Sequence, residues 1–151
     1  MHITGVLMSC AVVFCAQTAF ADEALRKKIS DASQSCGGDG VMTKVRAPAI
    51  ITRCNAALTT MSGLHAASQS NEFDRDWLNF HGGAVLILLA AAYVVENDNK
   101  PNKDACQSAI NADIFWSKIK PTPGSKLESD ITNDQLFNKL VPPCKKAYGI
   151  K

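Results

Sequence analysis

An apparent export signal and the cysteines downstream of it constrain this chain most. Residues 3–16 form an apolar run, and the small-residue cleavage pattern Ala19-Phe20-Ala21 follows it. We therefore expect residues 1–21 to be removed as a signal peptide. Residues 22–151 would then form a single α-helical domain, periplasmic or secreted. Four cysteines remain after that cleavage, namely Cys36, Cys54, Cys106 and Cys144.

The four remaining cysteines are expected to form two disulfides. No two of them have the Cys-x2-Cys spacing that is typical of zinc sites and of redox motifs. Disulfides also persist in the compartments to which a signal peptide leads. Four cysteines allow three pairings. We favour Cys36–Cys54 and Cys106–Cys144, and the alternatives stay open at this point.

Apolar residues recur at helical spacing through the first half of the mature chain. Steps of three and four predict one helix that ends at Gly37-Gly38 and a second that starts near Pro48, a residue tolerated in a first turn. Both cysteines of this half fall on the predicted apolar stripes, which are Leu25, Ile29, Ala32 and Cys36, then Ile51, Cys54, Leu58, Met61 and His65.

The third predicted helix begins around Asn71, a favourable N-cap, and ends in the polar run 96–99. Residues 82–95 carry no charge, but they are fewer than the twenty or so residues that span a bilayer, and acidic residues flank them. We therefore expect a buried central helix without stable membrane insertion. Its predicted stripe is Phe73, Trp77, Phe80, Ala84, Leu88, Ala91 and Val95.

The C-terminal part predicts two further helices. One follows Pro101-Asn102 and carries Ala105, Ala109, Ala112 and Trp116 along one side. Residues 121–131 suggest an irregular connection. Thr132 with Gln135 suggests a capping box for a short helix that ends at Pro142-Pro143. The expected fold is all-α: a single compact bundle of about five helices, stapled by two disulfides.

The charge distribution argues against general nucleic-acid binding. The formal net charge is +2, whereas a nucleic-acid binder needs a concentrated basic face. Residues 71–113 are mainly acidic, and the chain from Lys118 onward is mainly basic. An acidic face near Asp74, Asp76, Glu96 and Asp98 is a candidate contact for a basic target.

The start of the third predicted helix holds the candidate binding surface. Asp74, Asp76, Trp77 and His81 would share this helix end and form a small polar-aromatic pocket, with His81 four residues after Trp77. Helix capping and packing is the favoured role of this cluster, and a binding pocket is the alternative. The following Gly82-Gly83 would let a backbone or a ligand approach closely. We find no catalytic motif, no cofactor fingerprint and no metal-ligand spacing. Met61 with His65 is a two-ligand hint for copper, and core packing is the favoured role of this pair.

Residues 86–117 resemble one helical hairpin of the tetratricopeptide repeat family. Leu89-Ala90 and Tyr93 fall where that repeat carries Leu-Gly and Tyr, and Ala105, Ala109 and Ala112 match its second helix. Leu86 stands in place of the family's Trp, Ala90 in place of its Gly, and residues 100–102 look inserted. The resemblance implies degenerate repeat hairpins and a protein-binding groove rather than catalysis.

The leading hypothesis is an exported, non-enzymatic helical protein that binds another protein in the cell envelope or outside the cell. One alternative is an immunity or inhibitor protein that neutralises a periplasmic toxin or hydrolase. A second alternative is a small hydrolase that uses His81 with Asp74 or Asp76.

Overall fold

The fold comes from a computed structural model that describes residues 23–37 and 41–150. The predicted signal peptide lies outside the described residues. So does Gly38, the second residue of the Gly37-Gly38 pair at which the first helix was expected to end. Within these described residues the chain is all-helical and compactly packed, as predicted, with six helices instead of about five. These are residues 23–37, α2 (Ala47–Ser68), α3 (Glu72–Glu96), α4 (Lys103–Ser117), α5 (Lys126–Thr132) and α6 (Gln135–Ala147).

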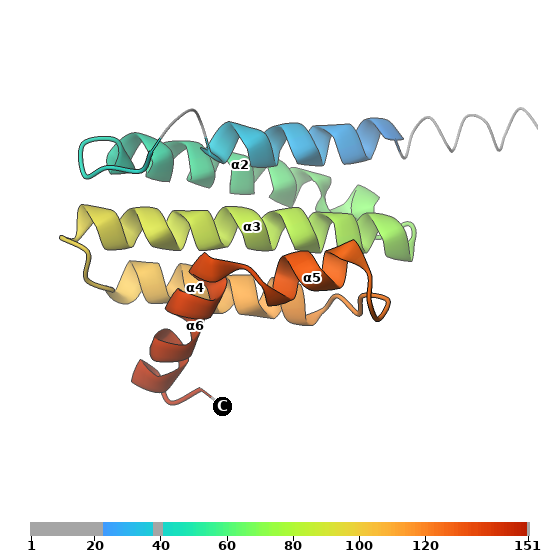
Figure 1. Cartoon of the computed structure of the whole chain (residues 1–151). Helices are drawn as coiled ribbons and strands as arrows, with labels where there is room; N and C mark the ends of the chain where they lie inside the picture. The colour runs from blue at the N-terminus through green and yellow to red at the C-terminus, as the bar shows by residue number, and fades with distance from the viewer. Residues whose placement is uncertain (1–22, 38–40, 151) are drawn as a thin grey trace, which may run out of the picture.

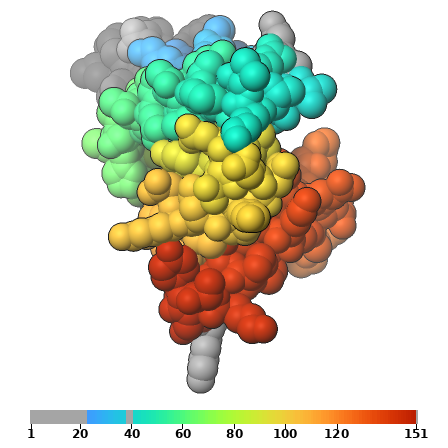
Figure 2. Space-filling model, turned by 90° about the vertical axis from the view of Figure 1, so that its left-hand side faces the viewer, coloured from blue at the N-terminus to red at the C-terminus, as the bar shows by residue number. Residues whose placement is uncertain are grey.

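The helices form layers on two sides of α3 (Figure 1). The helix at residues 23–37 and α2 lie on one side, and α4 and α6 lie on the other. Successive long helices run in alternating directions, as short connections require. Figure 2 shows the same order at one end of the molecule, with the start of α2 above, the α3–α4 connection in the middle and α6 below.

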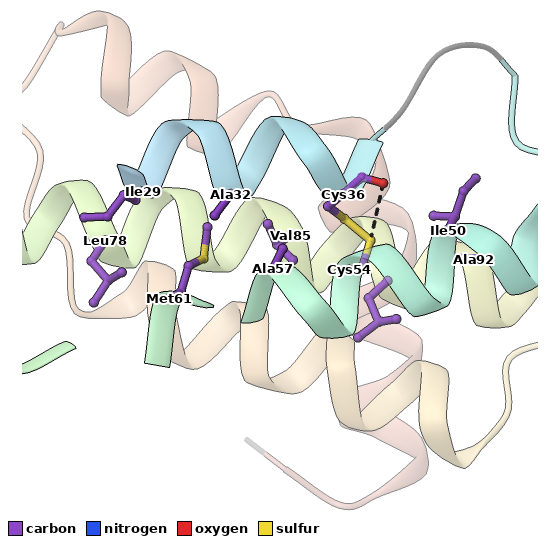
Figure 3. Packing of buried hydrophobic residues seen from close by; sticks show 11 residues of the cluster. Ile29, Ala32, Cys36, Ile50, Cys54, Ala57, Met61, Leu78, Val85 and Ala92 are labelled. Atoms are coloured by element: carbon purple, nitrogen blue, oxygen red, sulfur yellow. Dashed lines mark hydrogen bonds between the residues drawn. A yellow bond between two sulfur atoms is a disulfide. The ribbon is translucent and has the colours of Figure 1, made fainter. Parts of the chain in front are cut away.

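The central helix α3 contributes to both hydrophobic clusters of the protein. Leu78 and Val85 pack with residues of the first helix and α2 (Figure 3), and Leu89 belongs to the same cluster. Leu86 and Ile87 pack instead with α4 and α6. Burial on two sides explains why residues 82–95 lack charges, and it confirms the predicted central core helix. Among the described residues α3 alone is long and apolar enough to cross a membrane, and 56% of its most apolar window is buried within the protein.

Two disulfides connect the helices in the favoured pairing. Cys36–Cys54 joins the first helix to α2, with 4.3 Å between the Cα atoms. Cys106–Cys144 joins α4 to α6, with 5.1 Å between the Cα atoms. All four cysteines are buried. Such bonds persist in oxidising compartments, which agrees with a location outside the cytoplasm.

Side-chain caps fix the starts of several helices. Asn71 accepts a hydrogen bond from the backbone N–H of Asp74, as the predicted N-cap should, and Asn102 does the same for Ala105. Pro48 lies in the first turn of α2, also as predicted. The boundaries of α3 and α4 therefore follow from local chemistry.

The C-terminal prediction was wrong in three respects. Residues 126–132, expected to be irregular, form α5. Thr132 ends that helix, and Asp134 rather than Thr132 caps α6. Pro142 and Pro143 lie inside α6 instead of terminating it. Leu140, Val141 and the disulfide of Cys144 hold this segment on α4, so tertiary packing outweighs the two backbone N–H donors that the prolines lack.

Two predicted apolar stripes are displaced from the buried faces. In α2 the buried side is Ile50, Cys54, Ala57 and Met61, whereas His65 is exposed. In α3 the predicted stripe begins at Phe73, whose side chain is 58% exposed. The part of that stripe from Phe73 to Ala84 lies partly open to solvent, which makes it a candidate surface and not part of the core.

Candidate functional site

Three of the four residues predicted for the binding surface line one cavity. Asp76, Trp77 and His81 border a space of about 500 Å³ on the N-terminal half of α3. Phe73 and Phe80 of the same helix complete this side of the space. We call the rings of Phe73, Trp77, Phe80 and His81 the aromatic wall. Lys126, Leu127 and Asp130 of α5 form the opposite wall. We call this space the α3–α5 cavity.

Asp74 does not belong to this surface, which corrects the prediction for that residue. Its side chain is fully buried. Arg26 of the first helix donates to Oδ1 over 3.1 Å, and the Asn71 amide donates to Oδ2 over 2.8 Å. Asp74 therefore ties the first helix to the start of α3, and the first helix is the partner that sequence reasoning could not supply. It is not available as the partner of His81 in a hydrolytic pair.

The aromatic wall is an edge-on and tilted series of rings. The Trp77 ring centre lies 5.8 Å from that of Phe73 and 4.9 Å from that of His81. Phe80 meets His81 edge to face at 5.3 Å. The Trp77 indole N–H donates to the carbonyl oxygen of Arg26 over 3.2 Å, so the ring is anchored at its polar edge. The wall is consequently preorganised on a buried helix.

Sequence reasoning missed the α5 wall, although the sequence carries a signal for it. Ser125 accepts a hydrogen bond from the backbone N–H of Glu128. Ser125-Lys126-Leu127-Glu128 is therefore a Ser-x-x-Glu capping pattern at the start of this helix. No residue of α5 is buried, and Lys126 pairs with Asp130 one turn later over 2.6 Å. The polar residues of this segment suggest a loop when the sequence is read alone.

Partial burial shifts the pKa values of Asp76 and His81, the two titratable groups that α3 contributes to the cavity. Burial lowers the pKa of His81 below its ordinary value of 6.5, so the imidazole is neutral at pH 7. Burial raises the pKa of Asp76, and repulsion from Glu72 adds to this effect while Arg75 opposes it. Within the described parts of the chain Asp76 makes no hydrogen bond or ion pair. The cavity thus holds an unpaired carboxyl beside neutral rings.

Gly82 and Gly83 admit helix α4 rather than a ligand. A Cβ on Gly83 would lie 2.1 Å from Nε1 of Trp116, and one on Gly82 would lie 3.1 Å from the ring of Phe115. The Trp116 indole N–H donates to the carbonyl oxygen of Phe80 over 3.0 Å. The glycine pair therefore serves close helix packing just below the aromatic wall.

The four acidic residues proposed as one face are dispersed. Asp74 is buried, and at ~1.5 Å per residue Glu96 lies ~30 Å along α3 from Asp76. Asp98 lies beyond that far end and forms an ion pair with Lys44. Of the predicted acidic face, Asp76 alone belongs to the α3–α5 cavity.

A second cavity of about 260 Å³ lies between α2, α3 and α4 and is lined by Met61 and His65 among mainly apolar residues. Met61 is buried and His65 is exposed. Within residues 23–37 and 41–150, no group of three or more His, Cys, Asp or Glu side chains is placed to hold a metal ion. This cavity offers apolar packing space and little chemistry.

The lining of the α3–α5 cavity combines aromatic rings with an imidazole, two carboxyl groups and one ammonium group. Its lining includes no Ser, Thr or Cys hydroxyl or thiol to act as a nucleophile. His81 contacts Trp77 and Phe80 through its ring, and within the described residues it makes no hydrogen bond that would orient it as a base. Comparison with known proteins adds no assignment, because no family model, curated protein or solved structure matches this chain.

Proposed function

We propose that this chain is an exported, non-enzymatic helical protein that binds another protein through the α3–α5 cavity. The observation that carries the proposal is a set of accessible aromatic side chains, Phe73, Trp77 and Phe80, on the central helix of the core. Aromatic residues are enriched in protein–protein interfaces and among their energetic hot spots. A preorganised wall also lowers the entropy cost of binding.

The cavity extends far enough to receive a segment of a partner. A neighbouring space of about 430 Å³ shares Phe80 and Asp130 with the α3–α5 cavity and reaches Asn133 and Gln135. The two spaces follow α5 along α3. Two adjoining spaces that share Phe80 and Asp130 suit an extended or helical partner segment, whose side chains would enter them in turn. The repeat-like hairpin at residues 86–117 also favours protein binding, through the resemblance described above.

Export to the periplasm or beyond is supported by the cleavage pattern at residues 19–21 and by the two disulfides. An immunity or inhibitor protein is a narrower form of the same proposal. Its support was the acidic face, of which the cavity retains Asp76.

The proposed function is tested by affinity capture from the cell envelope with three forms of the mature protein. These are the unmodified protein, Phe73→Ser and Tyr148→Ser. Phe73 and Tyr148 are similarly exposed, at 58% and 48%, but Tyr148 lies after α6 and outside the cavity. We expect a partner that is retained by the unmodified protein and by Tyr148→Ser, and lost with Phe73→Ser. Equal retention by all three forms would contradict the proposal.

The hydrolase alternative now depends on His81 with Asp76, because Asp74 is engaged by Arg26. A hydrolytic activity that disappears in His81→Ala while the fold is retained would favour the enzyme over the binding protein. A quantitative hydrolysis assay of the unmodified protein and of His81→Ala distinguishes the enzyme from the binding protein.

A further inference from the structure

From the composition of the α3–α5 cavity we infer that it binds an arginine side chain presented by the partner protein. This inference rests on the proposed function and specifies the chemistry of its site. Two features carry it: the aromatic side chains of Phe73, Trp77 and Phe80 that line the cavity, and the carboxylate of Asp76, which has no hydrogen-bond or ion-pair partner among the described residues. Cations are attracted to aromatic faces, and a carboxylate supplies the counter-charge.

The protein already pairs a guanidinium with this aromatic series. Arg26 lies 5.0 Å from the ring centre of Phe73 and bonds the carboxylate of Asp74. Asp76 and Trp77, on the cavity side, offer the same two kinds of group to an incoming side chain. The internal pair shows that an arginine can satisfy both an aromatic face and a helix carboxylate at this position in the fold.

The local charges favour a cation over an anion. Lys126 is paired with Asp130, so these two charges largely offset one another. Glu72 and Arg75 act in opposite directions on Asp76. His81 is neutral at pH 7 because burial lowers its pKa, so it does not repel a cation. The remaining unpaired charge is the carboxylate of Asp76.

Arginine fits this lining better than lysine. The guanidinium group is planar and weakly hydrated, stacks on aromatic rings and donates two parallel hydrogen bonds to one carboxylate. A lysine ammonium is compact and strongly hydrated, and the mainly apolar lining gives it few acceptors. Arginine is also enriched among interface hot spots.

The test is a nuclear magnetic resonance titration of the mature protein with three probes at a fixed salt concentration. The probes are the N-acetyl methylamides of arginine, of lysine and of citrulline, the last being a neutral analogue of arginine. We expect the arginine probe to shift the Trp77 indole N–H and the backbone amides around the cavity in a saturable manner. The lysine probe should bind more weakly, and the citrulline probe more weakly still.

Three variants locate the binding. Asp76→Asn should lower the affinity for the arginine probe by about tenfold, since a charge-assisted hydrogen bond is lost. Asp104→Asn, at an exposed carboxylate on α4, should leave the affinity unchanged. Phe73→Leu, which keeps an apolar side chain at this 58% exposed position, should weaken binding while the fold is retained.

Several outcomes would overturn the inference. Equal binding of citrulline would show that charge is unimportant, and equal binding of lysine would remove the guanidinium assignment. An unchanged affinity in Asp76→Asn would exclude the proposed counter-charge.

The titration and the capture experiment fail independently. If the partner is lost with Phe73→Ser but the arginine probe does not bind, the groove binds a protein through other chemistry. If the arginine probe binds but no partner depends on Phe73, the arginine site stands without the proposed function.

Discussion

At Gly83 the absence of a side chain lets the Trp116 ring occupy the space beside α3. A Cβ there would lie 2.1 Å from Nε1 of Trp116, and the bond from this nitrogen to the Phe80 carbonyl leaves the ring little freedom to move. Overpacking of this kind disturbs the helix pair that supports the aromatic wall.

Gly83→Ala is therefore expected to lower the free energy of unfolding by about 2 kcal/mol. Gly63 provides the matched control, because it lies within α2 and a Cβ there meets no atom within 4 Å. Gly63→Ala should raise the free energy of unfolding by about 0.5–1 kcal/mol, as alanine favours a helix interior. Urea unfolding measures both, and equal effects would refute this account of Gly83.

The Arg26–Asp74 pair differs from the exposed ion pairs because Asp74 has no contact with solvent. Arg26→Met should lower the free energy of unfolding by about 3 kcal/mol, since it leaves a buried carboxylate without its cation. Lys27→Met, which removes the exposed pair with Asp31, should change it by less than about 0.5 kcal/mol. Thermal and urea unfolding compare the two, and similar effects would contradict the structural role of Asp74.

Burial of His81 predicts a pH-dependent contribution to stability. Its pKa is lowered in the folded state, so the unfolded state binds the proton more strongly. The contribution is fully present above the ordinary value of 6.5 and is lost as the pH falls through the lowered pKa of the folded state. The stability of the natural protein relative to His81→Gln should therefore decrease from pH 8 to pH 5 in urea unfolding. A constant difference would show that His81 is not desolvated.

The helices α3 and α5 differ most clearly in burial. The long helix α3 is buried on two sides, whereas α5 has seven residues and none of them is buried. Local opening needs little free energy where few apolar groups are buried. The two walls of the cavity therefore differ in stability.

Hydrogen exchange should separate these two walls. The amides of α5 are expected to exchange orders of magnitude faster than those in the centre of α3, because short exposed helices open without global unfolding. Mass spectrometry of peptic peptides covering residues 72–96 and 126–132 measures the difference. Comparable protection of both segments would show that α5 is more firmly docked than its burial indicates.

Local sequence rules identified most of the helices, and they failed where tertiary contacts decide. Asn71 and Pro48 marked helix starts because caps and first turns depend on nearby residues. Pro142-Pro143 suggested a stop, but contacts of Leu140 and Cys144 with α4 continue the helix. The site followed the same division. Trp77 and His81 share a face because they are four residues apart, and Asp76 lies beside them at the same helix end, whereas the burial of Asp74 depends on Arg26, which is distant in the sequence.

For the molecule as a whole, export and oxidation make a joint prediction. Protein recovered from outside the cytoplasm should begin at Asp22 and contain no free thiol, because Cys10 and Cys15 leave with the signal peptide and the other four are paired. Intact mass and non-reducing peptide mapping test this. Retention of residues 1–21, or a linked peptide that joins Cys54 to Cys106, would contradict it.

The two disulfides also divide the covalent structure of the molecule. Each closes a loop on its own side of α3, and neither spans residues 55–105, where all of α3 lies. The oxidised chain thus contains two disulfide-closed loops, and the backbone of residues 55–105 is the one covalent connection between them. The helix that carries the aromatic wall lies in this connection. One backbone cut in residues 97–102 would let denaturant separate the halves without reductant. One cut in residues 118–125 would leave the fragments linked until Cys106–Cys144 is reduced.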